Sequence, residues 1–245
     1  QYSFQLGYSN NGGLSYTYET FTDTINPSDT AVYTFSSTAD LSLSGTYNFI
    51  ALTKLIGDLN TINDSVFKPV VSYPTISVYP YTDDFDSGNL YWIDGGTSSS
   101  WVLGTPAKSI INSASTSPNS WVTNLTGNHN ASENSWVESP CMDMSSLVNP
   151  YIEFSLWYET SVIGSVQLQA STDNGGTLIT IGANGDPYNW YNGIITQGWT
   201  GSSSGWLTVQ HRLDNLAVEA NVKLRVLFNA NLIFTSEGLA FDDIH

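Results

Sequence analysis

Short segments in which apolar and polar residues alternate run along the whole chain, and turn residues separate them. In the first part of the chain these segments are residues 2–8, 14–18, 31–35, 47–52 and 66–71. Clusters of Asn, Gly, Pro, Ser and Asp stand between them. Alternation over about four to eight residues is typical of a β-strand with one buried face. Only the stretch around Met142 and Leu147 suggests a helical turn, so the sequence predicts an all-β protein.

The charge balance narrows the possible partners. Only 11% of the 245 residues are charged, and the 22 acidic residues outnumber the 6 basic ones to give a net charge of −16. Such a field repels nucleic acid and anionic membranes and attracts cations. No apolar run approaches the roughly 18 residues of a membrane-spanning helix. We therefore expect neither nucleic-acid binding nor membrane insertion.

The pattern changes near residue 80, where Pro74 and Pro80 bracket a short linker. All eight Trp residues follow this point. The sequence predicts two domains, residues 1–78 and 79–245. The five strand patterns of the first are fewer than the seven or so of an immunoglobulin-type sandwich. We expect a partial immunoglobulin-like sandwich that lacks its opening strands, followed by a jelly-roll β-sandwich.

A series of short motifs in residues 81–245 carries a family resemblance. These are Asp83-Asp-Phe-Asp-Ser-Gly, Trp101-Val-Leu-Gly-Thr-Pro, Asn134-Ser-Trp-Val-Glu-Ser-Pro, Pro150-Tyr-Ile-Glu-Phe-Ser-Leu-Trp and Glu237-Gly-Leu-Ala-Phe-Asp-Asp-Ile. In this order they resemble the MAM domain and the related cleaved-adhesin jelly rolls of bacterial surface proteins. The cysteines of animal MAM domains are absent, which fits the bacterial form. The resemblance implies a non-catalytic adhesion domain.

The first domain carries a second resemblance. Ser44-Gly-Thr-Tyr-Asn-Phe-Ile-Ala, followed by Gly57-Asp-Leu-Asn-Thr-Ile-Asn-Asp-Ser, is similar to the end of an immunoglobulin-like repeat in proteins exported by the type IX system. This implies an extracellular location at the outer cell surface. Three Asp-Ser/Thr-aliphatic triplets resemble the O-glycosylation acceptors of the same bacteria. They predict O-glycans on Thr24, Thr30 and Ser65.

Acidic residues gather at both ends of the second domain. Because the first and last strands of a jelly roll can lie side by side, their carboxylates are expected to meet. Converging acids repel one another unless a cation bridges them, and calcium prefers such oxygen ligands. We predict a structural calcium ion held by Asp84, Asp86, Asn134, Asp242 and Asp243, with Asp86 and Asp243 as the opposed ligands. The alternative is that these acids are solvated residues of strand edges.

The aromatic loop after residue 188 suggests a ligand site. Trp190, Tyr191, Trp199 and Trp206 stand close together in the sequence with Asn and Asp residues beside them. Exposed aromatic rings next to amides are a common way to hold sugar rings. The four residues are therefore candidate ligand-binding residues. The alternative is that their rings belong to the core.

Other motifs predict structure and no chemistry. Residues 171–178 resemble an Asp-box, a hairpin turn in which Asp173 binds backbone amides. Gly201-Ser-Ser-Ser-Gly matches the form of a nucleophile elbow but lies in a loop with no helix after it. Cys141 is the only cysteine and reads as a small buried residue.

Two functions follow from these observations. The leading one is a non-catalytic adhesion or interaction module of a secreted or cell-surface bacterial protein. Its expected partners are a cell-surface glycan or protein ligand and other domains of the same long chain. The alternative is an accessory carbohydrate-binding module of a secreted hydrolase or peptidase. An enzyme is the third and weakest reading.

Overall fold

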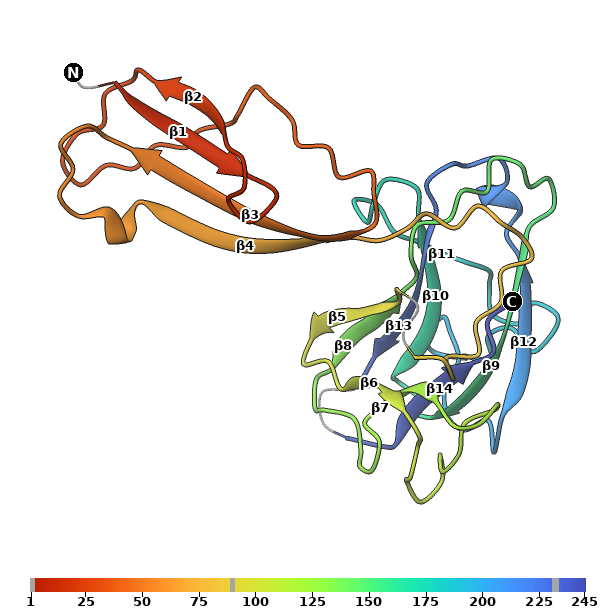
Figure 1. Ribbon diagram of the computed structural model, residues 1–245. Helices are drawn as coiled ribbons and strands as arrows, with labels where there is room; N and C mark the ends of the chain where they lie inside the picture. The colour runs from red at the N-terminus through yellow and green to blue at the C-terminus, as the bar shows by residue number, and fades with distance from the viewer. Residues whose placement is uncertain (1–2, 89–90, 231–233) are drawn as a thin grey trace. The chain divides into compact units, whose positions relative to one another are not determined.

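The computed structural model describes residues 3–88, 91–230 and 234–245, and within these ranges every regular element is a β-strand apart from two 3-10 turns (Figure 1). The all-β prediction is therefore confirmed. The chain divides into two compact units, residues 1–74 and 75–245. Residues 75–78, which the sequence analysis placed in the first domain, belong to the second unit, because Ile76 pairs with Met142 and packs against its core.

Unit 1 is one antiparallel sheet with the strand order β2-β1-β3-β4. Its elements are β1 (Phe4–Ser9), β2 (Thr17–Phe21), β3 (Gly45–Lys54), the 3-10 turn η1 (Thr61–Asn63) and β4 (Ser65–Ser72). The expected first strand included Tyr2, which lies outside the described residues. The expected strand at residues 31–35 does not form, because no neighbouring strand within the described ranges supplies a hydrogen-bonding partner.

Unit 2 is a sandwich of two five-stranded antiparallel sheets. The β13 sheet has the order β11-β10-β13-β8-β5, and the β14 sheet has the order β12-β9-β14-β7-β6. The strands are β5 (Ile93–Thr97), β6 (Trp101–Gly104), β7 (Ser120–Thr123), β8 (Asn134–Glu138), β9 (Tyr151–Glu159), β10 (Ser165–Ser171), β11 (Ile179–Thr180), β12 (Leu207–Arg212), β13 (Lys223–Asn229) and β14 (Gly238–Asp242), with the 3-10 turn η2 (Asp214–Leu216) after β12.

The core of unit 2 lies between these sheets and follows directly from the alternation. In β9, Ile152, Phe154, Leu156 and Tyr158 are buried while the residues between them are half-buried. Phe241 of β14 lies at the centre, with the rings of Phe85, Trp92, Trp101 and Phe154 at centroid distances of 5.7, 5.9, 5.7 and 6.5 Å. The abundance of Trp thus builds one aromatic core.

The outer faces of the two sheets differ. The loop of residues 105–119 covers the outer face of the β14 sheet, where Ile111, Val122 and Ala240 form a second small buried cluster. Lys108 anchors this loop by donating to the backbone carbonyls of Thr123 and Glu237. The outer face of the β13 sheet has no comparable buried cluster among the described residues, and its side chains are mostly half-exposed.

Candidate ligand-binding site

The outer face of the β13 sheet carries polar and aromatic side chains in three rows across the strands. Strand register gives the rows as Ile93–Glu138–Arg225–Gln169–Thr180, Gly95–Trp136–Leu227–Gln167 and Thr97–Asn134–Asn229–Ser165. The opposite residues of the same strands, such as Val137 and Val226, lie in the core. Because successive side chains of a strand point to opposite sides of the sheet, the amide, hydroxyl, guanidinium and indole groups of these rows all lie on its outer face.

Trp136 is the only tryptophan in these three rows. A Cβ on Gly95 would lie 2.5 Å from its ring, so the absence of a side chain there lets the indole extend over β5. The guanidinium of Arg225 lies 4.0 Å from the ring centroid, a cation–π contact that fixes the ring. Trp136 is half-buried in this arrangement, with the Arg225 guanidinium against its ring.

Glu138 forms ion pairs with two cationic side chains on the same face. Its Oε1 accepts from Lys223 at 2.9 Å, and its Oε2 accepts from Nη2 of Arg225 at 2.6 Å. The chain has 6 Lys and Arg residues in all, so two of them sit beside one carboxylate here. These three side chains are oriented by one another before any ligand arrives, which lowers the ordering cost of binding.

The sequence analysis did not identify this face. Asn134-Ser-Trp-Val-Glu-Ser-Pro served only as a family motif, although its alternation places Trp136 and Glu138 on one side of a strand. The sequence therefore indicated only the part of this face that lies on β8. The contributions of Arg225 and Gln169 depend on strand pairing, which the sequence did not specify.

Three of the four predicted ligand-binding aromatics lie in the core. Trp190, Tyr191 and Trp199 are 2%, 1% and 1% exposed. Trp190 Nε1 donates to the carbonyl of Ile181 at 3.0 Å, and Tyr191 Oη bridges the backbone N–H and carbonyl of Leu168. No face of these rings is open to a sugar, so the stacking hypothesis is wrong for these three residues. Loop aromatics here close the end of the sandwich.

Trp206 differs from the other three. It is half-buried, its ring lies 5.8 Å from that of Trp157, and its Nε1 donates to the carbonyl of Ser113 at 3.1 Å. The pair lies beside the loop that covers the β14 sheet. A ligand contact at Trp206 stays a prediction.

The two acidic ends of the jelly roll do come together. Asp83 N donates to the carbonyl of Ile244 at 3.0 Å, and Ile244 N donates back at 2.9 Å. Asp242 is fully buried, and its carboxylate accepts from the backbone N–H groups of Ser115, Thr116 and Asp243 at 3.0, 3.0 and 2.9 Å. Burial nevertheless raises the pKa of Asp242 to about 7, against these hydrogen bonds.

The remaining predicted calcium ligands divide into two groups. Asp86 accepts from Asn119 N at 2.9 Å and Asp243 accepts from Ser155 Oγ at 3.2 Å, and both lie near the paired ends. Asp84 lies there too and is exposed. Asn134 does not fit this group, because it pairs with Thr97 and Asn229 in the other sheet.

Within the described ranges no cluster of three or more His, Cys, Asp or Glu side chains converges in a metal-binding arrangement. The residues therefore fit calcium only in part: the acids around the Asp83–Ile244 pair supply some oxygen ligands, and backbone or water oxygens would have to supply the rest. Calcium binding stays a prediction.

The other motifs have structural roles. Asp173 Oδ1 accepts from Thr177 N and Ser171 Oγ, both at 2.7 Å, and these hydrogen bonds lower its pKa to about 2. This is the hairpin that the Asp-box pattern predicts. In the Gly-Ser-Ser-Ser-Gly loop, Ser203 Oγ donates to the carbonyl of Gly205 at 2.7 Å. Cys141 is half-buried, and burial raises the pKa of its thiol.

The predicted O-glycosylation sites lie on the surface of unit 1. Thr24 and Thr30 are exposed in the segment after β2, and Ser65 is exposed at the start of β4. Their hydroxyls are accessible to a modifying enzyme. Glycosylation itself stays a prediction.

A hollow at one end of unit 2 is a second place for a ligand. It has a volume of about 300 Å³ and an apolar and aromatic lining that includes Tyr79, Tyr81, Tyr151 and Met144. Tyr151 is 45% exposed and packs edge-on against His245 at 5.6 Å. This hollow has fewer hydrogen-bonding side chains than the outer face of the β13 sheet.

Comparisons with known proteins give distant similarities to solved structures. No protein-family model matches the chain, and no curated protein is significantly similar to it. The K1 cleaved adhesin domain of Lys-gingipain from Porphyromonas gingivalis is 15% identical, with a TM-score of 0.42, over 67% of this chain and 95% of that domain. The structure of TmCBM61 in complex with β-1,4-galactotriose is 15% identical, with a TM-score of 0.41, over 66% and 92%.

The K3 cleaved adhesin domain of the same gingipain is 11% identical, with a TM-score of 0.40, over 67% of this chain and 96% of that domain. Similarity at this level does not bear on what the chain binds.

Among the described residues, no helix has the length and apolar character to cross a membrane.

Proposed function

We propose that this chain is a non-catalytic interaction module of a secreted or cell-surface bacterial protein. In this proposal unit 2 binds a cell-surface glycan or protein ligand across the outer face of the β13 sheet. The observation that carries the proposal is the half-buried indole of Trp136, held by Arg225 on a face that also carries the amides of Asn134, Gln167 and Gln169. The opposite outer face is covered by its own loop.

The chemistry of this face suits a hydroxyl-rich ligand. The half-buried indole offers apolar surface to the C–H groups of a sugar, while Gln167, Gln169 and Asn134 offer donors and acceptors to its hydroxyls. Arg225, oriented by the buried carboxylate of Glu138, adds charge-assisted hydrogen bonds. Because the strands are rigid elements, these groups keep their spacing, which favours specificity for one ligand geometry.

A glycan array probed with the whole chain tests the proposal. Trp136→Ala and Gln169→Ala should each weaken binding to the best array ligand by about tenfold or more, the cost of about 1.4 kcal/mol. Trp206→Ala and Tyr151→Ala are matched controls at the other two aromatic sites. A tenfold loss in a control variant, with Trp136→Ala folded and fully active in binding, would move the site to the residue changed in that control.

The second candidate is an accessory carbohydrate-binding module attached to a secreted hydrolase or peptidase. The same face would then bind a polysaccharide substrate of the attached enzyme, and the other domains of the long chain would be its functional partners. Retention on insoluble polysaccharide favours this candidate, whereas binding to intact cells or to a purified surface protein favours the adhesion module.

The sequence resemblances supply the finer part of the proposal. The MAM-like and cleaved-adhesin motifs in unit 2 and the type IX repeat motif in unit 1 support an outer-surface location. The exposed Thr24, Thr30 and Ser65 are consistent with O-glycans in that setting. Mass spectrometry of the protein purified from its native host tests this: unmodified peptides at all three positions would remove the glycosylation proposal.

A further inference from the structure

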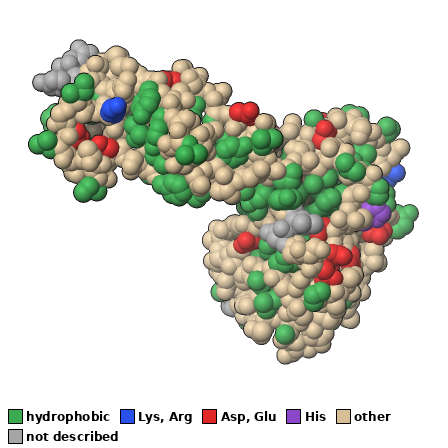
Figure 2. All heavy atoms as spheres, in the orientation of Figure 1, with side chains coloured by type: hydrophobic (Ala, Val, Ile, Leu, Met, Phe, Trp, Pro, Cys, Tyr) green, Lys and Arg blue, Asp and Glu red, His purple; other side chains and the backbone are tan. Residues whose placement is uncertain are grey.

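Unit 1 leaves most of its hydrophobic side chains uncovered. Among its described residues, Phe21 is the only hydrophobic side chain in the buried class. Val66 and Phe67 of β4 are 65% and 59% exposed, and Figure 2 shows hydrophobic side chains spread over the surface of this unit. A single sheet of four strands has no second layer against which to bury them.

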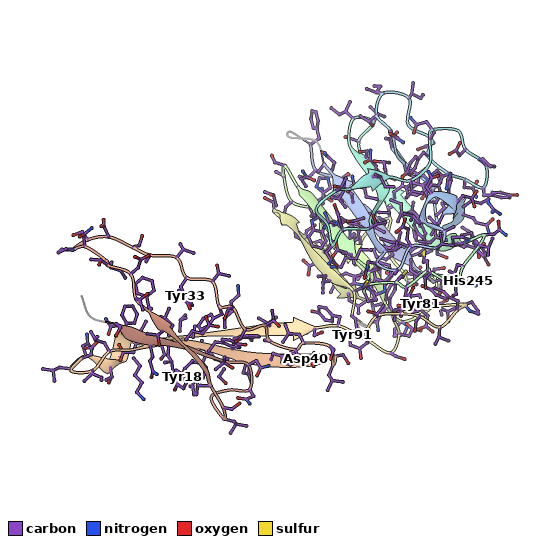
Figure 3. The ribbon with its side chains drawn as sticks, turned by 90° about the horizontal axis from the view of Figure 1, so that it is seen from above. Tyr18, Tyr33, Asp40, Tyr81, Tyr91 and His245 are labelled. Atoms are coloured by element: carbon purple, nitrogen blue, oxygen red, sulfur yellow. The ribbon has the colours of Figure 1, made fainter. Side chains whose placement is uncertain are left out.

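One segment takes the place of a second layer over part of the sheet. Residues 31–41, here called the strap, cross one face of the sheet over β1 and β2. The ring of Tyr33 lies 6.1 Å from that of Phe21, and the ring of Phe35 lies 4.9 Å from that of Tyr8. Tyr33 and Tyr18 lie on opposite sides of the sheet (Figure 3).

Glu19 fastens the strap to β2. Its carboxylate accepts from Tyr33 Oη at 2.6 Å, from Ser36 N at 2.9 Å and from Ser37 N at 3.0 Å. These hydrogen bonds lower the pKa of Glu19 to about 2. The strap is therefore a defined element with a fixed place on the sheet.

The backbone of the strap lacks the partners that its sequence suits. Residues 31–35 alternate like a strand: Tyr33 and Phe35 pack on the sheet, and Val32 points away with 97% exposure. Within the described ranges, the N–H and C=O groups of residues 31–35 take part in no ladder and no other backbone hydrogen bond. Residues 31, 32 and 34 are exposed and Tyr33 and Phe35 are half-buried, and their backbone groups are available to a further strand.

An apolar groove runs over β3 and β4 on the face that the strap occupies. One hollow of about 360 Å³ is lined by Leu41, Phe49, Ala51, Val66, Lys68 and Val70. A second hollow of about 320 Å³ shares Ala51 and Val66 with it and reaches Tyr33 and Phe35 of the strap. Strand register places Ala51 opposite Val66 and Phe49 opposite Lys68, so these side chains lie on one face.

We propose that this groove accepts an extended β-strand from a separate polypeptide. The incoming strand pairs with the free backbone of residues 31–35 and inserts alternate apolar side chains between the strap and the β3–β4 face. Main-chain hydrogen bonds then supply affinity, and the groove selects the side chains. Added to the strap, the strand forms the second layer that unit 1 otherwise lacks.

Charge indicates the kind of strand. Residues 1–74 contain six acidic residues, Glu19, Asp23, Asp29, Asp40, Asp58 and Asp64, against Lys54 and Lys68. A strand that carries Lys or Arg at its ends is attracted to this surface. A second copy of the chain, itself at −16, is repelled. The occupant is therefore a basic, alternating strand of another protein.

A fluorescent peptide of about ten residues, with alternating Val and Thr and with Lys at each end, is the probe for binding to the full chain. The control peptide has the same composition with the Val residues in one block. We expect only the alternating peptide to bind, and we expect hydrogen exchange to slow at residues 31–35 when it does.

Val66→Lys places a charge in the groove. It should weaken binding of the alternating peptide by about tenfold or more. Phe67→Lys is the matched control, because Phe67 is the next residue of the same strand and faces the other side of the sheet. Ala51→Lys repeats the test if Val66→Lys fails to fold.

Three results would overturn the proposal: no binding of the alternating peptide, equal binding of the blocked peptide, or equal weakening by Phe67→Lys. Concentration-dependent dimerisation in sedimentation, with no peptide binding, would also overturn it and assign the groove to a second copy. Because none of these measurements involves the β13 sheet, their outcome is independent of the proposed function of unit 2.

Discussion

Asp83 and Ile244 exchange two backbone hydrogen bonds, with N···O distances of 3.0 and 2.9 Å, so the first and last segments of unit 2 lie side by side. This pairing brings Asp86 and Asp243 into the same region although 157 positions, the difference between 243 and 86, separate them in the sequence. Asp242, two residues before Ile244, is buried and accepts from the backbone N–H groups of Ser115 and Thr116 in the loop of residues 105–119.

The first prediction concerns calcium at the paired ends. In millimolar calcium, the melting midpoint of unit 2 should lie several degrees above its value in the presence of a chelator. A gain of about 1 kcal/mol in the free energy of unfolding moves the midpoint by roughly 2–4 °C for a domain of this size. Asp243→Asn should abolish the response. Asn134→Ala is the control that should keep it, because Asn134 lies in the other sheet. A response that survives Asp243→Asn would place the ion elsewhere.

The second prediction concerns the pH dependence of Asp242. Its pKa is raised to about 7 in the folded protein, so the folded state retains a proton between about pH 4 and pH 7 that the unfolded state loses. Its contribution to stability is therefore present at low pH and is lost as pH rises to about 7. Asp242→Asn should gain stability relative to wild type by about 3 kcal/mol from pH 4.5 to pH 7.5, since the proton difference extends over about 2.5 pH units at about 1.36 kcal/mol each.

Urea unfolding followed by tryptophan fluorescence gives this difference, because all eight Trp residues lie in unit 2. A constant difference in unfolding free energy between the variant and wild type across that pH range would show that folding does not raise the pKa of Asp242. Any fixed cost of the substitution cancels in the comparison.

The third prediction concerns the buried cation. Lys108 is 7% exposed, and burial lowers its pKa to about 8. Lys108→Met removes the ammonium that donates to the carbonyls of Thr123 and Glu237 and should cost about 2–5 kcal/mol in urea unfolding. Arg212→Met is the comparison: its pair with Asp214 is exposed, so the loss should be at most about 1 kcal/mol. Similar losses for both variants would refute the anchoring role of Lys108.

The fourth prediction separates the core aromatics from Trp206. Trp199→Ala removes a buried ring whose Nε1 donates to Asn189 at 2.8 Å, and it should cost about 3–5 kcal/mol of unfolding free energy. Trp206→Ala removes a half-buried ring and should cost about 1–2 kcal/mol. Thermal unfolding of both variants checks the order. A larger loss for Trp206→Ala would contradict the burial described here.

The sequence determined the kind of element and the division of the chain. Period-2 alternation fixes which side chains of a strand share a face, because successive side chains point to opposite sides. That is why β9 could be read directly, with Phe154 and Leu156 inward. It is also why the sequence predicted a strand at residues 31–35: the alternation is present, but the segment pairs with no described strand and the prediction is wrong.

The tertiary structure alone decided which side chains meet. Burial depends on what covers a face, so the sequence could suggest Trp190 and Trp199 as ligand contacts while the sandwich encloses them at 2% and 1% exposure. Strand register, set by contacts distant in the sequence, brings Arg225 onto Trp136 and leaves Asn134 far from the Asp83–Ile244 pair. Alternation is a local property of the chain, whereas a binding face is assembled from several strands, and its composition is fixed only when those strands pair.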